Sequence, residues 1–489
     1  MSATPAKPSA DTASWVGNPR AFIAPLALAQ FMCSFAGSNM NVMINDISRD
    51  LHTDVKGVQT TITLFLLIMA VLMIPCSKLT DRFGRKRCLV GGLILYGIGT
   101  VLSAIAPGLG ILILGNSVFQ GVGTAFLIPP VYILTTMAFT SLQSRAKAFG
   151  VISGLGGIGA AAGPLIGGLI TSAISWRGAF VFQALVVATI IILGRRVVDP
   201  VPPDPKRPFD TVGAILSAVG MFCLVFGILQ ADTNATLLIV FVVIGVAFLA
   251  GFYLFVRSRE RAGKEALLST SLFKSRPSNL GLVTQNLQWL LLMGVSFTVS
   301  VFLQTERHYS AIKTGVIFTA ATLGILASSL AAERLAKRYQ QKTLIAAGFV
   351  TTAAGIGLLL GLVGLASSSA WAFAPGLLLI GLGLGVMLTP SVNIVQGAFP
   401  EEKQGEISGL SRSVSNLGSS FGTAVAGTIL VSDLVSGNGT YIAAMIVLAV
   451  LAIVGIGVSL LLPANPLQAS STDAAPRTSA APVLDTAPG

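Results

Sequence analysis

The sequence is poor in charge and in the residues that build catalytic or metal sites. Only 10% of its 489 residues are charged, and it contains two histidines and four cysteines. Soluble domains carry about 25% charged residues, so a soluble globular protein is excluded. No CxxC pair, no HExxH motif and no nucleotide-binding loop occurs, which argues against a zinc enzyme and against direct drive by ATP. We therefore expect no enzyme activity, no cofactor and no metal.

Long apolar runs dominate what is present. Apolar residues make up 53% of the chain and the mean hydropathy is +0.82. Runs of about 20 apolar residues are long enough to cross a bilayer. We expect fourteen spans, over residues 21–44, 58–77, 88–106, 109–136, 148–170, 178–194, 211–229, 236–256, 278–304, 314–332, 342–364, 371–396, 406–431 and 440–462. An open chain in lipid must satisfy its own backbone hydrogen bonds, so an all-α membrane protein is predicted.

The basic residues divide unequally between the two faces of the predicted bundle. The net charge of +12 comes from 31 lysines and arginines against 19 acidic residues. With both termini placed in the cytoplasm, 26 of these 31 basic residues fall on the cytoplasmic side and five on the other. This positive-inside distribution predicts a multi-pass protein of the cell membrane with both termini cytoplasmic. It also accounts for the net charge without nucleic-acid binding.

A charged hexapeptide occurs twice. Asp81–Lys86 reads DRFGRK, and Glu333–Arg338 reads ERLAKR, 252 positions later. Each copy follows the second span of its half, so two six-helix halves are predicted. The expected division is a cytoplasmic N-terminal tail (1–20), a first half (21–194), two inserted helices (211–256), a second half (278–462) and a disordered tail (463–489). Repeated halves are typical of transporters, with the substrate path between them at the midplane.

The fifth predicted span is rich in small residues. Gly150–Gly168 reads GVISGLGGIGAAAGPLIGG and includes Gly159, Gly163, Pro164 and Gly167. Glycine and alanine let helix backbones approach closely in lipid, and proline adds a bend. The segment is therefore predicted to be a packing surface and flexible joint between moving helices. Its spacing resembles the antiporter signature of major facilitator superfamily exporters.

The loop after the second span carries another motif. Ser77–Arg87 reads SKLTDRFGRKR and resembles the loop between helices two and three of the same superfamily, with serine in place of the family's first glycine. An aspartate at a helix end can pair with a nearby arginine and with the N-terminus of a helix in the same half. We expect this cluster to hold the cytoplasmic side shut in one state and to break in the other. The residues assigned to it are Asp81, Arg82, Gly84 and Arg85.

Three further segments resemble the fourteen-helix drug:proton antiporter branch of this superfamily. They are Ser175–Arg177, Phe209–Gly213 and Gly405–Gly422. With the two motifs above, the resemblance covers nearly the whole chain. It implies the major facilitator fold, with fourteen helices as two six-helix halves plus two inserted helices. It also implies secondary active transport, with drug:proton antiport as the commonest activity.

Two departures from that branch remove charge from the membrane. The branch's span-one aspartate position is Ala36 here, and its span-four arginine position is Asn116. An unpaired buried charge is costly, so the loss of one favours the loss of the other. Neutral polar residues line one face of span one instead, and we expect them to face a wet cavity or a partner helix. The predicted substrate-binding residues are Gln30, Ser38, Asn41, Asn116, Gln120, Gln285, Gln288, Trp289, Asn393 and Gln396.

Few ionisable residues remain to couple transport to protons. Asp46 ends span one, Glu306 ends span nine, and Arg412 lies about two turns inside span thirteen. A coupling group must titrate as it moves between water and a dry site. These three residues are the coupling candidates, against the alternative that both acids are solvated charges at loop edges. Arg412 could instead bind an anionic group or extend to the cytoplasmic face.

We predict a monomeric exporter of small hydrophobic or amphipathic compounds, coupled to proton influx by alternating access between the two halves. A mostly neutral cavity favours neutral or singly charged substrates over multiply charged cations. Two alternatives remain open. One is an uncoupled carrier of lipids or metabolites with the same fold, which the missing charges favour. The other is a non-transporting membrane sensor on the same scaffold.

Overall fold

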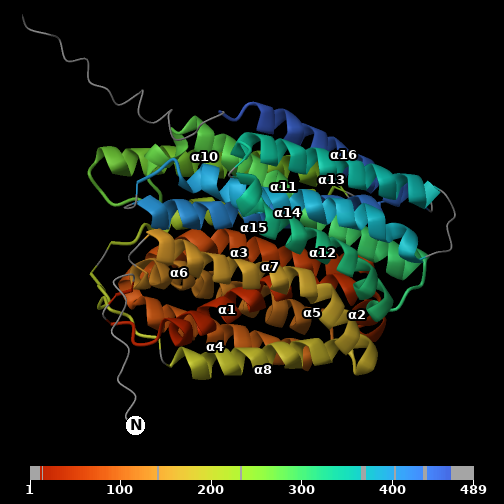
Figure 1. The fold of residues 1–489 in the computed structure, drawn as a ribbon, viewed down its shortest axis with the longest axis horizontal. Coiled ribbons are helices and arrows are strands. Elements are labelled where there is room, and N and C mark those ends of the chain that lie inside the picture. Colours follow the sequence, from red (N-terminus) through yellow and green to blue (C-terminus); the bar gives the residue numbers. More distant parts are fainter. Residues whose placement is uncertain are drawn as a thin grey trace, which may run out of the picture.

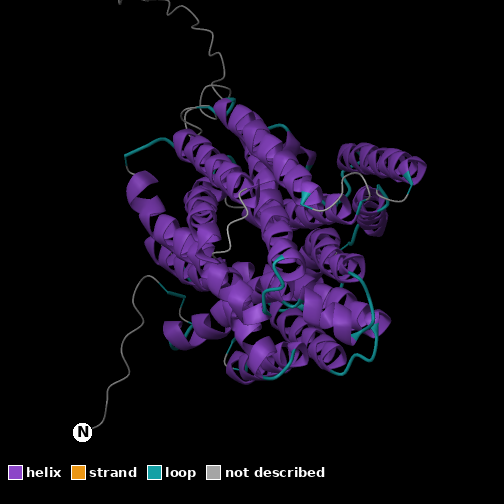
Figure 2. Cartoon of the chain, turned by 90° about the vertical axis from the view of Figure 1, so that its right-hand side faces the viewer, coloured by secondary structure: helices purple, strands orange, loops and turns teal. Residues whose placement is uncertain are grey.

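The computed structural model describes residues 12–463 except 14, 140–141, 196, 207, 232–233, 337, 365–369, 401–402 and 433–437. These residues form an assembly of helices (Figure 2), with no strand in the described part of the chain beyond a single bridge between Thr12 and Phe139. The predicted all-α class is confirmed. Most of the predicted tails, 1–20 and 463–489, lies outside the described residues, as does Lys337 of the second hexapeptide.

The helices occur in three groups along the chain. The first contains α1 (Pro19–Asn39), η1 (Met40–Val42), α2 (Ile44–Asp50), α3 (Val55–Phe83), α4 (Arg85–Ala104), α5 (Leu109–Leu112), η2 (Ile113–Gln120), α6 (Gly121–Ala138), α7 (Leu142–Ala173) and α8 (Trp176–Gly194). The second contains α9 (Thr211–Leu229) and α10 (Ala235–Arg261). The third contains η3 (Thr270–Phe273), α11 (Arg276–Val301), η4 (Phe302–Glu306), α12 (Ala311–Ala336), α13 (Gln341–Gly364), η5 (Ala370–Phe373), α14 (Ala374–Gln396), α15 (Gln404–Val431) and α16 (Gly439–Leu460).

The number of membrane-crossing helices agrees with the prediction. Thirteen helices in the described residues are long and apolar enough to span a bilayer. The two segments of α7, Lys147–Ala160 and Ala162–Ala173, make a fourteenth span if they are counted together, with a bend of 43° between them. Pro164 explains the bend, because proline cannot donate a hydrogen bond to the carbonyl four residues earlier and its ring crowds that carbonyl.

One predicted loop is helical instead. The motif at 77–87 is expected from the sequence to connect two spans as a loop, but α3 continues to Phe83 and α4 begins at Arg85. Gly84 alone separates them, with a φ of 93° that glycine adopts without a Cβ clash. The hydropathy pattern marks where a helix leaves the hydrocarbon layer, and charged residues beyond that point can still be helical. For the same reason α10 continues to Arg261, past its predicted limit at 256.

The first and third groups pack with the same internal pattern (Figure 1). The pairs α1–α7, α4–α6 and α4–α8 of the first group correspond in order to α11–α15, α13–α14 and α13–α16 of the third. The two groups meet along two seams, α3 against α15 and α7 against α12. In each seam the second spanning helix of one group packs against the fifth of the other. The residue limits proposed for the two halves stay a prediction.

The inserted pair covers one of these seams. Val225 and Leu229 of α9 form an apolar cluster with Leu67 of α3 and Ala424 of α15. α10 packs against α9. Only 11% of the residues in the apolar 18-residue stretch of α10 are buried within the protein. We infer that α10 faces lipid, while α9 seals the line where α3 meets α15.

The glycines of α7 allow close contact with α1. A Cβ atom on Gly159 would overlap the backbone carbonyl oxygen of Phe31. Gly163 lies equally close to the side chain of Ser38, and Gly167 packs against Asn39. Helix backbones can approach to this distance only where no side chain intervenes.

The next face of α7 contacts the other group of helices. A Cβ on Gly168 would overlap the carbonyl oxygen of Ala311, and one on Gly315 would overlap the carbonyl oxygen of Pro164. Both Ala311 and Gly315 belong to α12. The small residues of α7 therefore bring two helices into contact with it, one from its own group and one from the other.

Alanine at two glycines of α7 should affect stability differently. Gly159→Ala creates a backbone overlap and should cost about 1–3 kcal/mol. Gly154 lies on the same helix, and a methyl group added there would have nothing within 4 Å, so Gly154→Ala should be neutral or stabilise by up to about 1 kcal/mol. Thermal unfolding of the two purified variants in detergent measures the difference. Equal melting temperatures would contradict the close α1–α7 contact.

Candidate functional site

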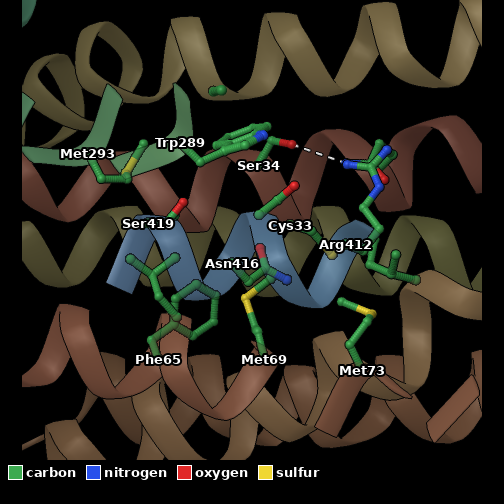
Figure 3. A pocket seen from close by; sticks show the side chains of 16 residues that line it. Cys33, Ser34, Phe65, Met69, Met73, Trp289, Met293, Arg412, Asn416 and Ser419 are labelled. Atoms are coloured by element: carbon green, nitrogen blue, oxygen red, sulfur yellow. Dashed lines mark hydrogen bonds between the residues drawn. The ribbon is translucent and has the colours of Figure 1, made fainter. Parts of the chain in front are cut away.

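A cavity lies between the two groups of helices, near the middle of its lining spans (Figure 3). It contains about 600 Å³ of atom-free space, including the part that opens to solvent. Its apolar wall includes Phe65, Met69, Met73, Ile128, Trp289 and Met293. Its polar wall includes Gln30, Ser34, Arg412, Ser415, Asn416 and Ser419. Apolar walls with a few polar groups are typical of small-molecule sites.

A hydrogen-bonded chain at the cavity wall links α1 to α15 through α6. The Gln30 side chain donates to the Ser34 hydroxyl at 3.2 Å and accepts from the Tyr132 hydroxyl at 3.2 Å. Arg412 donates to the same Tyr132 hydroxyl, and its guanidinium carbon lies 4.7 Å from the centre of the Tyr132 ring. Phe149 stacks on the tyrosine at 5.7 Å between ring centres. Three helices thus hold one arginine at the cavity wall.

Three of the predicted binding or coupling residues line this cavity: Gln30, Trp289 and Arg412. Sequence reasoning missed Tyr132 and Asn416. Tyr132 is an aromatic residue within an apolar run, and no neighbouring polar residues in the sequence indicate a binding site there. Asn416 lies within one of the family-like segments, but only the packing of α15 shows that it shares a wall with Arg412.

Other predicted binding residues pack between helices. The Gln288 side chain donates to the carbonyl of Leu384 on α14, and Gln285 accepts from the Ser411 hydroxyl on α15. Gln120 donates to Ser103, and Ser38 bonds to carbonyls of its own helix. These contacts match the alternative of interhelical or local hydrogen bonding. A role in substrate binding stays a prediction for these four residues.

The remaining polar candidates lie elsewhere. Asn116 is buried in η2, a π-helical turn, and its side-chain amide nitrogen has no acceptor among the described residues. Asn393 is exposed near the end of α14, while Gln396 donates to Ser408 of α15 at 3.1 Å. None of the three lines the cavity described above.

The two groups of helices are joined by ionic contacts at one end. We call this the basic end, because Arg85, Lys86, Arg195, Lys206 and the basic residues of 257–276 lie there. Lys78 of α3 forms an ion pair with Glu406 of α15 at 2.6 Å. The other carboxylate oxygen of Glu406 accepts from the backbone N–H of Ser269. One carboxylate therefore connects both groups and the segment between α10 and α11.

The predicted charge cluster lies beside this contact. Asp81 accepts from the Arg85 side chain at 2.6 Å, as its predicted pairing with arginine requires. The N-terminus of α4, however, is capped by Asp199, which accepts from the backbone N–H groups of Arg85 and Lys86 at 2.7 and 3.2 Å. Asp199 follows α8, and no motif in the sequence marked it as the cap of α4. Arg82 stacks near the Phe83 ring, 5.9 Å from its centre.

Neutral amides join the two groups at the opposite end. Gln304 of η4 accepts from the backbone N–H of Asn45, and the Asn45 side chain donates to the Gln304 carbonyl at 2.5 Å. The Gln304 side chain also donates to the carbonyl of Asn41 at 2.8 Å. The hydrogen bonds of Gln304, which lies in a π-helical turn, therefore link Asn41 and Asn45 of the first group to the third group. We call these three residues the opposite-end latch.

The two acidic coupling candidates are near this latch in sequence. Asp46 follows Asn45 on α2 and is half-buried, whereas Glu306 ends η4 and is exposed. Burial raises the pKa of the Asp46 carboxyl above its ordinary value of 3.8, and Arg49 opposes the shift. One turn further along α2, hydrogen bonding from Arg177 lowers the pKa of Asp50.

Two sets of helices with the same packing pattern, arranged around a cavity, are typical of membrane transporters. The family model of the Major Facilitator Superfamily matches residues 26–286 and 281–485. The chain therefore belongs to the Major Facilitator Superfamily, and it is a transporter and not an enzyme.

Its relatives include antibiotic resistance and efflux proteins. It is 30% identical to the puromycin resistance protein of Streptomyces alboniger over 82% of this chain and 80% of that one. It is 27% identical to a multidrug efflux pump of Mycolicibacterium smegmatis, over 87% and 82%. It is also 27% identical to the tetracenomycin C resistance and export protein of Streptomyces glaucescens, over 85% and 77%. The predicted family and efflux-type transport are confirmed.

Asparagine at two positions of α2 should change stability in opposite directions. Since the pKa of Asp46 is raised on folding, its ionisation costs stability as the pH rises from 3.8 through the folded-state pKa. Asp46→Asn should therefore raise the melting temperature at pH 7, and the gain should vanish at low pH. Since the pKa of Asp50 is lowered, its stabilising effect is present above 3.8 and is lost as the pH falls through the folded-state pKa.

Asp50→Asn should accordingly lower the melting temperature at pH 7. Thermal unfolding of both variants across a pH series measures the two effects. A gain of stability in both variants, or a loss in both, would contradict the opposite environments of these carboxylates.

Proposed function

We propose that this protein exports small amphipathic or hydrophobic compounds from the cytoplasm in exchange for protons, by alternating access. The basic end faces the cytoplasm in this proposal, because loops rich in lysine and arginine stay on that side of a membrane. The resistance and export proteins among its relatives support efflux as the direction.

The observation that carries the proposal is the cavity where the two groups meet. Methionine side chains are flexible and polarisable, so they adapt to apolar molecules of different shape. Trp289 adds a flat aromatic surface, and Ser34 and Gln30 add hydrogen-bonding groups on the facing helix. Such a wall suits varied amphipathic molecules better than one strictly defined substrate.

Alternating access needs contacts that can form and break at both ends. At the basic end the Lys78–Glu406 ion pair closes the seam between α3 and α15. We assign Asp81, Arg82, Gly84 and Arg85 to the support of this closure within the first group. At the opposite end, the Asn41–Gln304 and Asn45–Gln304 bonds close the path. Gly159, Gly163 and Gly167 pack α7 against α1 of its own group, and Pro164 contacts Gly315 of α12 in the other group, so we assign to α7 the surface on which the groups rock.

Asp46 is the proposed coupling residue, ahead of Glu306, because it is half-buried beside the opposite-end latch. Proteoliposomes with and without an imposed pH gradient test this assignment. A compound panel should be transported faster with the gradient, and Asp46→Asn should abolish this acceleration while downhill transport continues. Glu306→Gln is the matched control and should keep the response.

A second candidate function is an uncoupled carrier with the same fold. It is favoured by the composition of the described cavity wall, which contains no carboxylate. The same assay separates the two functions. Transport that is unchanged when the pH gradient is collapsed in the unmodified protein would establish the uncoupled carrier and overturn proton antiport.

Removal of the cavity tryptophan should weaken substrate binding. Trp289→Ala takes away an aromatic surface from the cavity wall, and the KM for an aromatic substrate should rise about tenfold, which corresponds to about 1.4 kcal/mol. Trp371→Ala is a matched control, because Trp371 is 66% exposed at the start of the helix pair η5–α14. Transport kinetics in proteoliposomes measure both variants. An equal KM in the two variants would argue against this cavity as the binding site.

A further inference from the structure

Arg412 carries the one charged side chain on the cavity wall among the described residues. It extends from α15 toward α6, where its guanidinium group lies against the Tyr132 ring and donates to the Tyr132 hydroxyl. The hydroxyl in turn donates to Gln30. This arrangement fixes the position of the arginine, but it supplies no negative charge.

No carboxylate lies within ion-pair distance of Arg412 in the described part of the chain. Glu406, the described acidic residue near this end of α15, pairs with Lys78 at 2.6 Å instead. A guanidinium group has five N–H donors, and one hydroxyl and one aromatic face satisfy only part of them. An unpaired charge at a membrane-buried wall is costly and marks a functional site by default.

A second donor on the same helix face points to a ligand. Asn416 lies four residues after Arg412, one helical turn away, and lines the same cavity (Figure 3). Its side-chain nitrogen is buried and has no hydrogen-bond acceptor among the described residues. A buried donor without an acceptor is uncommon. The guanidinium and the amide are thus two neighbouring donors on a cavity-lining face of α15, and the described chain leaves part of their hydrogen-bonding capacity unfilled.

Building on the proposed function, we propose that the cavity prefers aromatic compounds with a carboxylate group. The carboxylate accepts hydrogen bonds from Arg412 and Asn416, a geometry that arginine suits because its N–H groups can bind both oxygens of one carboxylate. The flat body of the ligand then lies between Trp289 and Met293 of α11 on one side and Phe65 of α3 on the other, which Figure 3 shows around the same space.

The charge of such a ligand has a consequence for energetics. With the basic end in the cytoplasm, export moves a negative charge out of a compartment that is electrically negative. The membrane potential favours this movement. Inward movement of a proton is favoured by the same potential, so an aromatic carboxylate and a proton exchanged in opposite directions add their driving forces.

Three probes that differ in charge but not in ring system test the proposal. They are 2-naphthoate, 2-naphthamide and 2-naphthylmethylammonium, and their affinities for the purified full chain are measured by equilibrium binding. The unmodified protein should bind the carboxylate about tenfold more tightly than the amide, because hydrogen bonds to a charged group are stronger than neutral ones. It should bind the ammonium probe most weakly.

Variants then locate the preference. Arg412→Gln should remove the difference between carboxylate and amide while the amide still binds, and that retained binding shows that the variant is folded. Asn416→Leu should weaken carboxylate binding severalfold, which keeps the proposal testable if Arg412→Gln fails to fold. Arg261→Gln is the matched control, because Arg261 is exposed at the end of α10, and it should keep the full preference.

The outcomes separate this inference from the proposed function. Equal affinity for naphthoate and naphthamide in the unmodified protein, or an unchanged preference in Arg412→Gln, overturns the carboxylate site but leaves export intact. Binding with the expected preference, but without movement of any probe in proteoliposomes, overturns export and leaves the site intact. Octanoate binding more tightly than naphthoate overturns the aromatic part and assigns the cavity to aliphatic acids.

Discussion

The structure depends on one constraint: polar groups that leave water must find partners inside the protein. For the backbone this requirement is met within each helix, so in the membrane the described chain forms helices and no sheet. For side chains it is met across helices. Gln288 reaches the Leu384 carbonyl, and the Ser413 hydroxyl of α15 reaches the Ala70 carbonyl of α3. Polar residues therefore join helices of this bundle at positions where lipid supplies no hydrogen-bond partner.

The two ends of the path meet that constraint with different chemistry. At the basic end, near loops that reach water, a Lys78–Glu406 ion pair joins the groups. At the opposite end the contact rests on amides, with Gln304 facing Asn41 and Asn45. Ionic contacts weaken with salt, and amide contacts do so far less. Added salt is therefore expected to weaken the contact at the basic end more than the contact at the opposite end.

Close helix contact and the central cavity are two results of the same arrangement. Glycines on α7 bring it against α1 and α12, and α3 lies along α15. Between these seams lies the cavity, and both the large side chains of Phe65, Met293 and Trp289 and several polar residues line it. The arginine on that wall has a tyrosine and a glutamine to position it but, among the described residues, no acid to neutralise it. Its missing partner is the feature that most directly suggests what the cavity accepts.

Much of this protein followed from its sequence alone. Hydropathy determined the helical class and the number of spans, because burial of a helix in lipid requires an apolar run of fixed length. The order of charges in DRFGRK and the glycines of α7 indicated the family. Tertiary structure alone decided which polar residues meet. Gln30 and Trp289 lie at the cavity while Gln288 packs against α14, and Asp199 rather than Asp81 caps α4. Helical spacing shows which residues share a face, but only the packing of distant helices determines what that face contacts.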